Sequence, residues 1–205
     1  MKHLIIIALL SLMAYQGNAQ KTTNMLTPQE REKAIKLLEQ TETGVFDAVK
    51  GLSEAQLNYK AAPDKWSVAD CVKHIAAAEK ELWAMAQPTL AQAPNPEKRA
   101  EIKFGDDDLI KAVEDRTHKS KTFAALEPAN SPYKTVEEAL AAFKANRQKL
   151  IALVKNTDID LRNHIVVLPV GTFDSYQFIL LIGAHSNRHT QQIDEVKANP
   201  DFPKH

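Results

Sequence analysis

The stretch LLIGAHSNRHTQQIDEV, residues 180–196, indicates the fold because its apolar positions repeat with the period of an α-helix. Steps of three and four residues keep side chains on one face of a helix. Followed in both directions, the pattern predicts a long helix that begins at Asp174 and ends near Asn199 and Pro200. The inward stripe of this helix consists of Phe178, Leu181, Ile182, His185, His189, Ile193 and Val196. Two histidines therefore interrupt a row of core residues.

Helix start signals elsewhere predict four more helices. A capping side chain followed three residues later by an acid satisfies free amides of the first turn, and this arrangement occurs at Thr27, Ser67 and Thr135. Three consecutive acids at 106–108 complement the positive end of a helix dipole. The predicted segments run from Pro28 to Gly51, Val68 to about Gln87, Asp106 to about Leu126, Thr135 to about Lys155, and Asp174 to about Asn199.

The connections between these helices are modest. Residues 52–65 and 88–96 predict irregular chain, and residues 161–172, with Pro169 and Gly171, predict an extended loop or a weak hairpin. The sequence contains no repeat, no glycine-rich phosphate loop and no alternation of strands with helices. The sequence therefore predicts an all-α protein, an up-and-down four-helix bundle.

The first residues predict export. A short basic start is followed by an apolar run at residues 4–14 and by small residues at 17 and 19. The run is shorter than a membrane-spanning helix, so residues 1–19 are interpreted as a cleaved secretory signal peptide, with a retained anchor as the alternative. Residues 20–205 would then form one helical domain that is periplasmic or secreted, without stable membrane association after cleavage.

Charge and cysteine content limit the possible partners and sites. Lysine plus arginine equals aspartate plus glutamate at 26 each, so no basic field points to a nucleic-acid partner. The single cysteine, Cys71, excludes an internal disulfide and a multi-cysteine zinc site. Cys71 itself is interpreted as a core residue, with a nucleophile as the alternative. Any metal site in this chain must use histidine and oxygen ligands.

His185 and His189 project from successive turns of one helix face, a spacing that lets two imidazoles share a metal ion. The competing hypothesis is that both are satisfied by hydrogen bonds from neighbouring helices, because a buried polar group without a partner costs about 1–3 kcal/mol. A third ligand could come from His74, which lies beside the apolar face of the predicted helix from Val68. Three neutral imidazoles with an open position are typical of a catalytic metal site.

The other histidines are weaker candidates. His3 leaves with the signal peptide, His118 lies among basic residues, and His205 is the last residue. His164 precedes the last helix and is a possible pocket residue or extra ligand. Glu79 could be an acidic partner of the site, although a solvent-exposed role is the simpler interpretation.

Three pieces of the chain together resemble the DinB-like family, more closely its branch called the DinB superfamily. Two of these pieces contain the motifs W-S-x6-H and H-x3-H, which together are fairly specific. The three pieces are residues 52–60 leading to Pro63, KWSVADCVKHIAAAE at 65–79, and GAHSNRHTQQIDEVK at 183–197 followed by Pro200, Phe202 and Pro203.

The resemblance covers nearly all of residues 20–205 and implies a DinB-like four-helix bundle with a divalent metal held by three histidines. Those ligands fall on His74, His185 and His189, all of which are histidine here. The family includes thiol-dependent transferases and hydrolases, and its name, from induction by DNA damage, does not imply nucleic-acid binding.

The leading hypothesis is an exported metal-dependent hydrolase that uses zinc or nickel and acts on an unidentified small molecule. Zinc lowers the pKa of a bound water to about 7. The alternatives are a non-catalytic metal or small-ligand binding module, a thiol-dependent transferase, and a plain bundle with hydrogen-bonded histidines. Low-molecular-weight thiols are scarce outside the cytoplasm, which disfavours the transferase. An exposed helix face could also support a homodimer.

Overall fold

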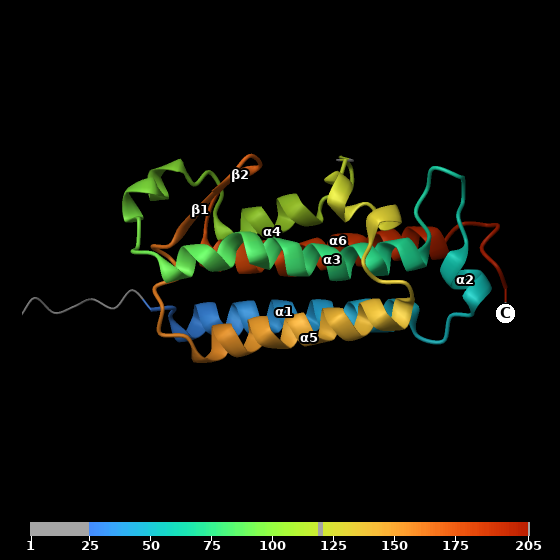
Figure 1. Cartoon of the computed structure of the whole chain (residues 1–205), viewed down its shortest axis with the longest axis horizontal. Coiled ribbons are helices and arrows are strands. Elements are labelled where there is room, and N and C mark those ends of the chain that lie inside the picture. The colour runs from blue at the N-terminus through green and yellow to red at the C-terminus, as the bar shows by residue number, and fades with distance from the viewer. Residues whose placement is uncertain (1–24, 119–120, 205) are drawn as a thin grey trace, which may run out of the picture.

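Four long helices form the body of the computed structural model, which describes residues 25–118 and 121–204 (Figure 1). The four are α1 (Pro28–Val49), α3 (Val68–Ala86), α5 (Val136–Asn156) and α6 (Ser175–Lys197). The proposed signal peptide, residues 1–19, lies outside the described residues. Within the described residues, every helix is too short or too polar to span a lipid bilayer.

The helix starts lie where the sequence predicts them. The side chains of Thr27 and Ser67 each accept a hydrogen bond from the third helical amide. The carboxylate of the acid at that third position accepts the backbone N–H of the capping residue, so both capping boxes are confirmed. Thr135 and Asp174 cap α5 and α6 in the same way through their side chains. Gly51 follows the end of α1 with φ of +75°, a conformation that favours glycine.

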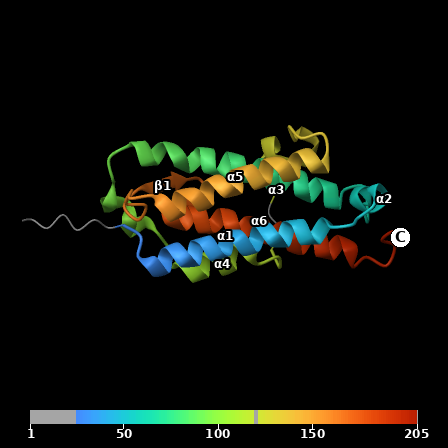
Figure 2. The same ribbon diagram turned by 90° about the horizontal axis from the view of Figure 1, so that it is seen from below.

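The direction of the helices differs from the up-and-down prediction, which is wrong in this respect. α1 and α6 run one way, while α3 and α5 run the other way side by side (Figures 1 and 2). The reason is the long connection between α3 and α5, residues 87–135. Its helix α4 (Asp106–Glu114) carries the chain back along the bundle, so α5 begins at the same end as α3.

The described residues of the connection form four 3-10 turns besides α4: η1 (Gln87–Ala91), η2 (Pro96–Glu101), η3 (Ala124–Leu126) and η4 (Pro128–Asn130). The prediction that the third helix reaches Leu126 is wrong, because α4 ends at Glu114. The Asp115 carboxylate accepts the backbone N–H of Thr117 at 2.8 Å, and Arg188 of α6 donates to the carbonyl oxygens of Val113 and Asp115. These bonds satisfy the helix end without another turn.

Two shorter elements complete the fold. Residues 165–174 form an antiparallel hairpin of β1 (Ile165–Leu168) and β2 (Gly171–Asp174), which confirms the hairpin alternative. The segment interpreted as irregular at 52–65 contains the short helix α2 (Glu54–Asn58), whose first turn Ser53 caps. The chain is therefore mostly helical, with one small hairpin at an end of the bundle (Figure 1).

Arg147 of α5 is fully buried and contacts all three other bundle helices. A guanidinium group has five N–H donors, and here each one has an acceptor. The acceptors are both carboxylate oxygens of Glu79 on α3 (2.8 and 2.6 Å), the Leu38 carbonyl (2.7 Å) and Thr41 hydroxyl (2.6 Å) on α1, and the Ser186 hydroxyl (2.9 Å) on α6. Glu79 is 2% exposed, so the solvent-exposed interpretation of that residue is wrong, and its carboxylate binds Arg147 instead of a histidine of the triad.

We expect Arg147→Met to lower the free energy of unfolding by about 3–5 kcal/mol, because it leaves the Glu79 carboxylate buried without its partner. Urea denaturation of the purified protein measures this change. The exposed Lys149 on the same helix supplies the control, since Lys149→Met should stay within about 0.5 kcal/mol of wild type. The double variant Glu79→Leu, Arg147→Met should recover part of the loss; a double variant less stable than the single one contradicts this account.

Candidate metal centre

The three histidines chosen from the sequence meet inside the bundle. α3 supplies His74 and α6 supplies His185 and His189, and one ring nitrogen from each lies within 4.8 Å of the other two. The ring centroids are 4.4 to 5.2 Å apart. Among the described residues, no cysteine or carboxylate joins this group, so it offers three nitrogen ligands.

Hydrogen bonds fix the orientation of two of the rings. His74 Nδ1 lies 2.8 Å from the carbonyl oxygen of Leu126, and His189 Nδ1 lies 2.9 Å from Oε1 of Gln192. Because these oxygens can only accept, both Nδ1 atoms carry the proton and Nε2 keeps its lone pair. Ring nitrogens that ligate metals are generally held in this way by a partner of the other nitrogen.

Gln192 is itself contacted by Arg116, in the segment that follows α4. Its Oε1 also accepts a hydrogen bond from Arg116 at 3.4 Å, and Arg116 binds both carboxylate oxygens of Glu195 at 2.6 and 2.7 Å. The sequence reasoning missed this chain of contacts. Gln192 could have been found, since it lies three residues after His189 on the same helix face. Arg116 could not have been found, because the sequence predicts one helix from Asp106 to about Leu126.

Burial keeps the three imidazoles neutral. Desolvation lowers the pKa of His74, and it lowers the pKa of His185 to about 3, with a further contribution from the neighbouring His74. The pKa of His189 lies well below its ordinary value for the same reason, reinforced by the other two histidines. Neutral imidazole is the form that binds metals, so the site is ready to accept an ion at neutral pH.

Trp66 closes one side of the group. Its indole stacks on His189 with the ring centroids 5.7 Å apart and the planes 19° from parallel. The centroid of the indole also lies 4.8 Å from that of the His74 ring. His74 and His189 are 2% and 8% exposed, whereas His185 is half-buried. Solvent therefore reaches the group past His185.

The weaker sequence candidates lie elsewhere. His164 is buried at the base of the hairpin. Its ring nitrogens lie 2.6 Å from the carbonyl oxygen of Asp160 and 3.2 Å from that of Gln92, so it connects these loops and is no extra ligand of the triad. His118 is exposed, as predicted. Cys71 is fully buried, which confirms the core interpretation, and burial raises the pKa of its thiol far above neutrality.

Comparisons with known proteins identify the family to which this chain is similar. The model described as DinB superfamily matches residues 37–193. The uncharacterized protein YuaE of Bacillus subtilis (strain 168) is 29% identical over 157 residues, covering 74% of this chain and 90% of YuaE. A solved structure, YfiT from Bacillus subtilis, superposes with a TM-score of 0.58 at 18% identity, over 84% of this chain and 88% of YfiT. YfiT is described as "a probable metal-dependent hydrolase with an unusual four-helix bundle topology".

We expect Gln192→Leu to weaken zinc binding by about 10- to 100-fold, because His189 loses the acceptor that orients its ring. Competition with a chromogenic chelator measures the affinity. Gln191→Leu is the matched control, since its side chain bonds the carbonyl oxygen of Glu114 instead of a histidine. Equal affinities for the two variants would exclude a role for Gln192 in holding the site.

The lowered histidine pKa values also set a pH dependence for the metal-free protein. Histidine in an unfolded chain has a pKa near 6.5. Below that pH the unfolded state therefore binds protons that the folded state, with its lowered histidine pKa values, does not bind. The free energy of unfolding should therefore fall between pH 6 and 5 by up to about 1.4 kcal/mol per pH unit for each histidine. Urea titrations with chelator present test this. The slope should be shallower in His185→Ala than in the wild type; equal slopes in the two proteins would contradict it.

Proposed function

The chain belongs to the DinB superfamily, and from that premise we propose that it is an exported metal-dependent hydrolase. The observation that carries the proposal is the convergence of His74, His185 and His189 as three neutral nitrogen ligands. The description of the structural neighbour YfiT as a probable metal-dependent hydrolase supports the same reading.

The donor set fits a catalytic metal better than a structural one. Structural zinc sites generally have four protein ligands, whereas catalytic sites keep a position for water or substrate. The described residues offer three imidazoles and no fourth ligand, and the half-buried His185 leaves one edge open to solvent. When bound, the ion would supply an activated water and polarise a carbonyl oxygen.

The surrounding residues of this chain have defined tasks in that proposal. The Leu126 carbonyl and Gln192 would hold two rings so that Nε2 faces the ion, and Trp66 covers the rings of His74 and His189. Imidazole ligands suit zinc, nickel, copper and iron, and among these we propose zinc or nickel.

The location and partners belong to the same proposal. Residues 1–19 would direct the chain to the periplasm or the exterior and be removed, which mass spectrometry of the mature protein tests by an N-terminus at Gln20. The partner would be a small-molecule substrate, because the balanced charge gives no general attraction to nucleic acid.

We expect untagged wild-type protein to purify with close to one divalent ion per chain and to hydrolyse an ester or amide substrate in a chelator-sensitive manner. His189→Ala removes a ligand and should weaken metal binding by about 100-fold or more, with loss of activity. Elemental analysis and a screen of ester, amide and thiol-conjugate substrates measure both effects. His118→Ala is the control, because this exposed histidine lies outside the centre.

Three outcomes separate the alternatives. Equal trace metal in wild type and His189→Ala would exclude the metal site. Stoichiometric metal without turnover of any substrate would indicate a binding module instead of an enzyme. Turnover restricted to thiol conjugates would indicate a transferase, and activity that survives chelation would contradict every metal-dependent reading.

A further inference from the structure

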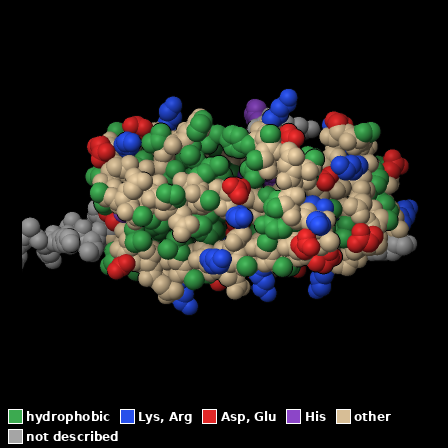
Figure 3. Space-filling model, viewed as in Figure 1, with side chains coloured by type: hydrophobic (Ala, Val, Ile, Leu, Met, Phe, Trp, Pro, Cys, Tyr) green, Lys and Arg blue, Asp and Glu red, His purple; other side chains and the backbone are tan. Residues whose placement is uncertain are grey.

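A groove leads away from the candidate metal centre along α6. α3 and α4 both pack against α6, while they make little contact with each other, so α6 forms the floor between two helical walls. Figure 3 shows hydrophobic side chains gathered around a hollow on this face of the molecule. His185, the half-buried member of the triad, lies on the floor helix at the opening.

The side chains that line the groove next to His185 are apolar. Leu181 lies four residues before His185 and therefore on the same side of α6. Leu82 follows His74 on α3 by two successive four-residue steps, which keeps it on the side of α3 that faces α6. Both leucines are half-buried and pack against the main core, so part of each side chain stays exposed.

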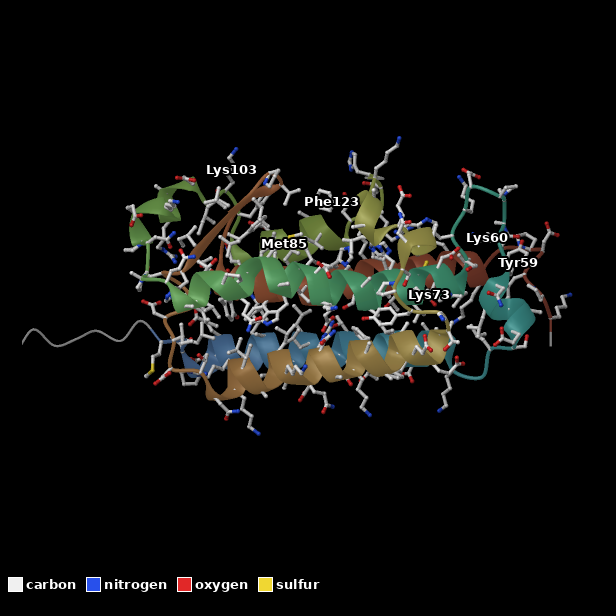
Figure 4. The ribbon with its side chains drawn as sticks, viewed as in Figure 1. Tyr59, Lys60, Lys73, Met85, Lys103 and Phe123 are labelled. Carbon is white, nitrogen blue, oxygen red and sulfur yellow. The ribbon has the colours of Figure 1, made fainter. Side chains whose placement is uncertain are left out.

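Exposed hydrophobic residues surround the opening. Met85 of α3 and Phe123, just before η3, are 42% and 55% exposed and lie on the same face (Figure 4). Val167 and Val170 of the neighbouring hairpin are 52% and 65% exposed. Exposed large apolar side chains close to a hollow are typical of a surface that binds an apolar ligand.

The stretch of α3 between the triad and Met85 is as long as a chain of several carbons. Met85 lies eleven residues beyond His74, which corresponds to about 16 Å along the axis of α3. An acetyl group would leave most of this length empty, whereas a medium-length aliphatic chain would lie against Leu82, Leu181 and Met85 with its polar end at His185. Such contacts remove hydrocarbon surface from water and offer nothing to an anionic group.

We propose that the groove binds the unbranched acyl chain of a carboxylic ester, with the ester carbonyl placed at the triad. This inference rests on the proposed hydrolase function and assigns its substrate class. Water adds to the acyl carbon, the bond from that carbon to the alkoxy oxygen breaks, and the products are a fatty acid and an alcohol. No redox partner is needed.

The metal-loaded protein should distinguish p-nitrophenyl acetate, butyrate and octanoate by chain length. Each methylene that enters the groove should lower KM by roughly fourfold, because its burial contributes about that factor in affinity. Even if only two of the six additional methylenes enter the groove, kcat/KM should rise at least about tenfold from acetate to octanoate. Leu82→Asn and Leu181→Asn should each reduce this octanoate-to-acetate ratio by about tenfold.

Leu153→Asn is the matched control, because Leu153 is a half-buried leucine of α5 that packs against the same core and lies away from the groove. It should destabilise the protein in thermal denaturation to a similar extent while leaving the octanoate-to-acetate ratio unchanged. An equal fall of that ratio in Leu153→Asn would overturn the proposal, since the effect would then report loss of stability alone.

Calorimetric titration with octanamide and acetamide, with and without chelator, separates this proposal from the hydrolase function. Binding of octanamide to the metal-free protein, weakened by Leu82→Asn, supports the groove even if no ester is cleaved. Metal-dependent cleavage without chain-length preference and without octanamide binding overturns the groove and leaves the hydrolase standing. Octanamide binding that is equal in wild type and Leu82→Asn also overturns it.

Discussion

The position of the buried Arg147 side chain constrains the rest of the structure. A guanidinium group taken out of water is costly unless each of its donors has an acceptor, and here the acceptors come from three different helices. Glu79 lies five residues after His74, and Ser186 is the neighbour of His185. The register of α3 against α6 at the triad is therefore tied to one arginine of α5. The geometry of the candidate metal centre and the stability of the bundle depend on the same set of contacts.

The features that the sequence predicts correctly are those decided within a few residues. A capping threonine, serine or aspartate satisfies amides of its own helix, so the starts at Thr27, Ser67, Thr135 and Asp174 could be found without knowing the fold. The convergence of three histidines is a second case. The i, i+4 spacing and the apolar stripe marked His185 and His189, and the position of His74 beside another apolar face marked it as the third member of the group.

The features that could not be predicted depend on contacts between distant parts of the chain. α4 ends early because Arg188, more than seventy residues later, occupies its last carbonyl groups. The burial of Glu79 follows from Arg147, and neither residue carries a local sign that it will leave the surface. The direction of α5 depends on how far the chain travels between residues 87 and 135, which no single motif encodes. The partners of the triad, Leu126 and Arg116, lie in that same stretch.

The parallel arrangement of α1 and α6 has a consequence for the order in which the molecule is made. The first helix contacts the last one along its length, and the Tyr176 hydroxyl donates to the Glu30 carbonyl across 146 positions of sequence. Contacts between residues so far apart form late, because a long loop must close first. Residues 50–174 are therefore synthesised before α1 has its main neighbour, and His74 emerges well before His185 and His189. Neither the bundle nor the histidine triad can therefore be completed before α6 has left the ribosome.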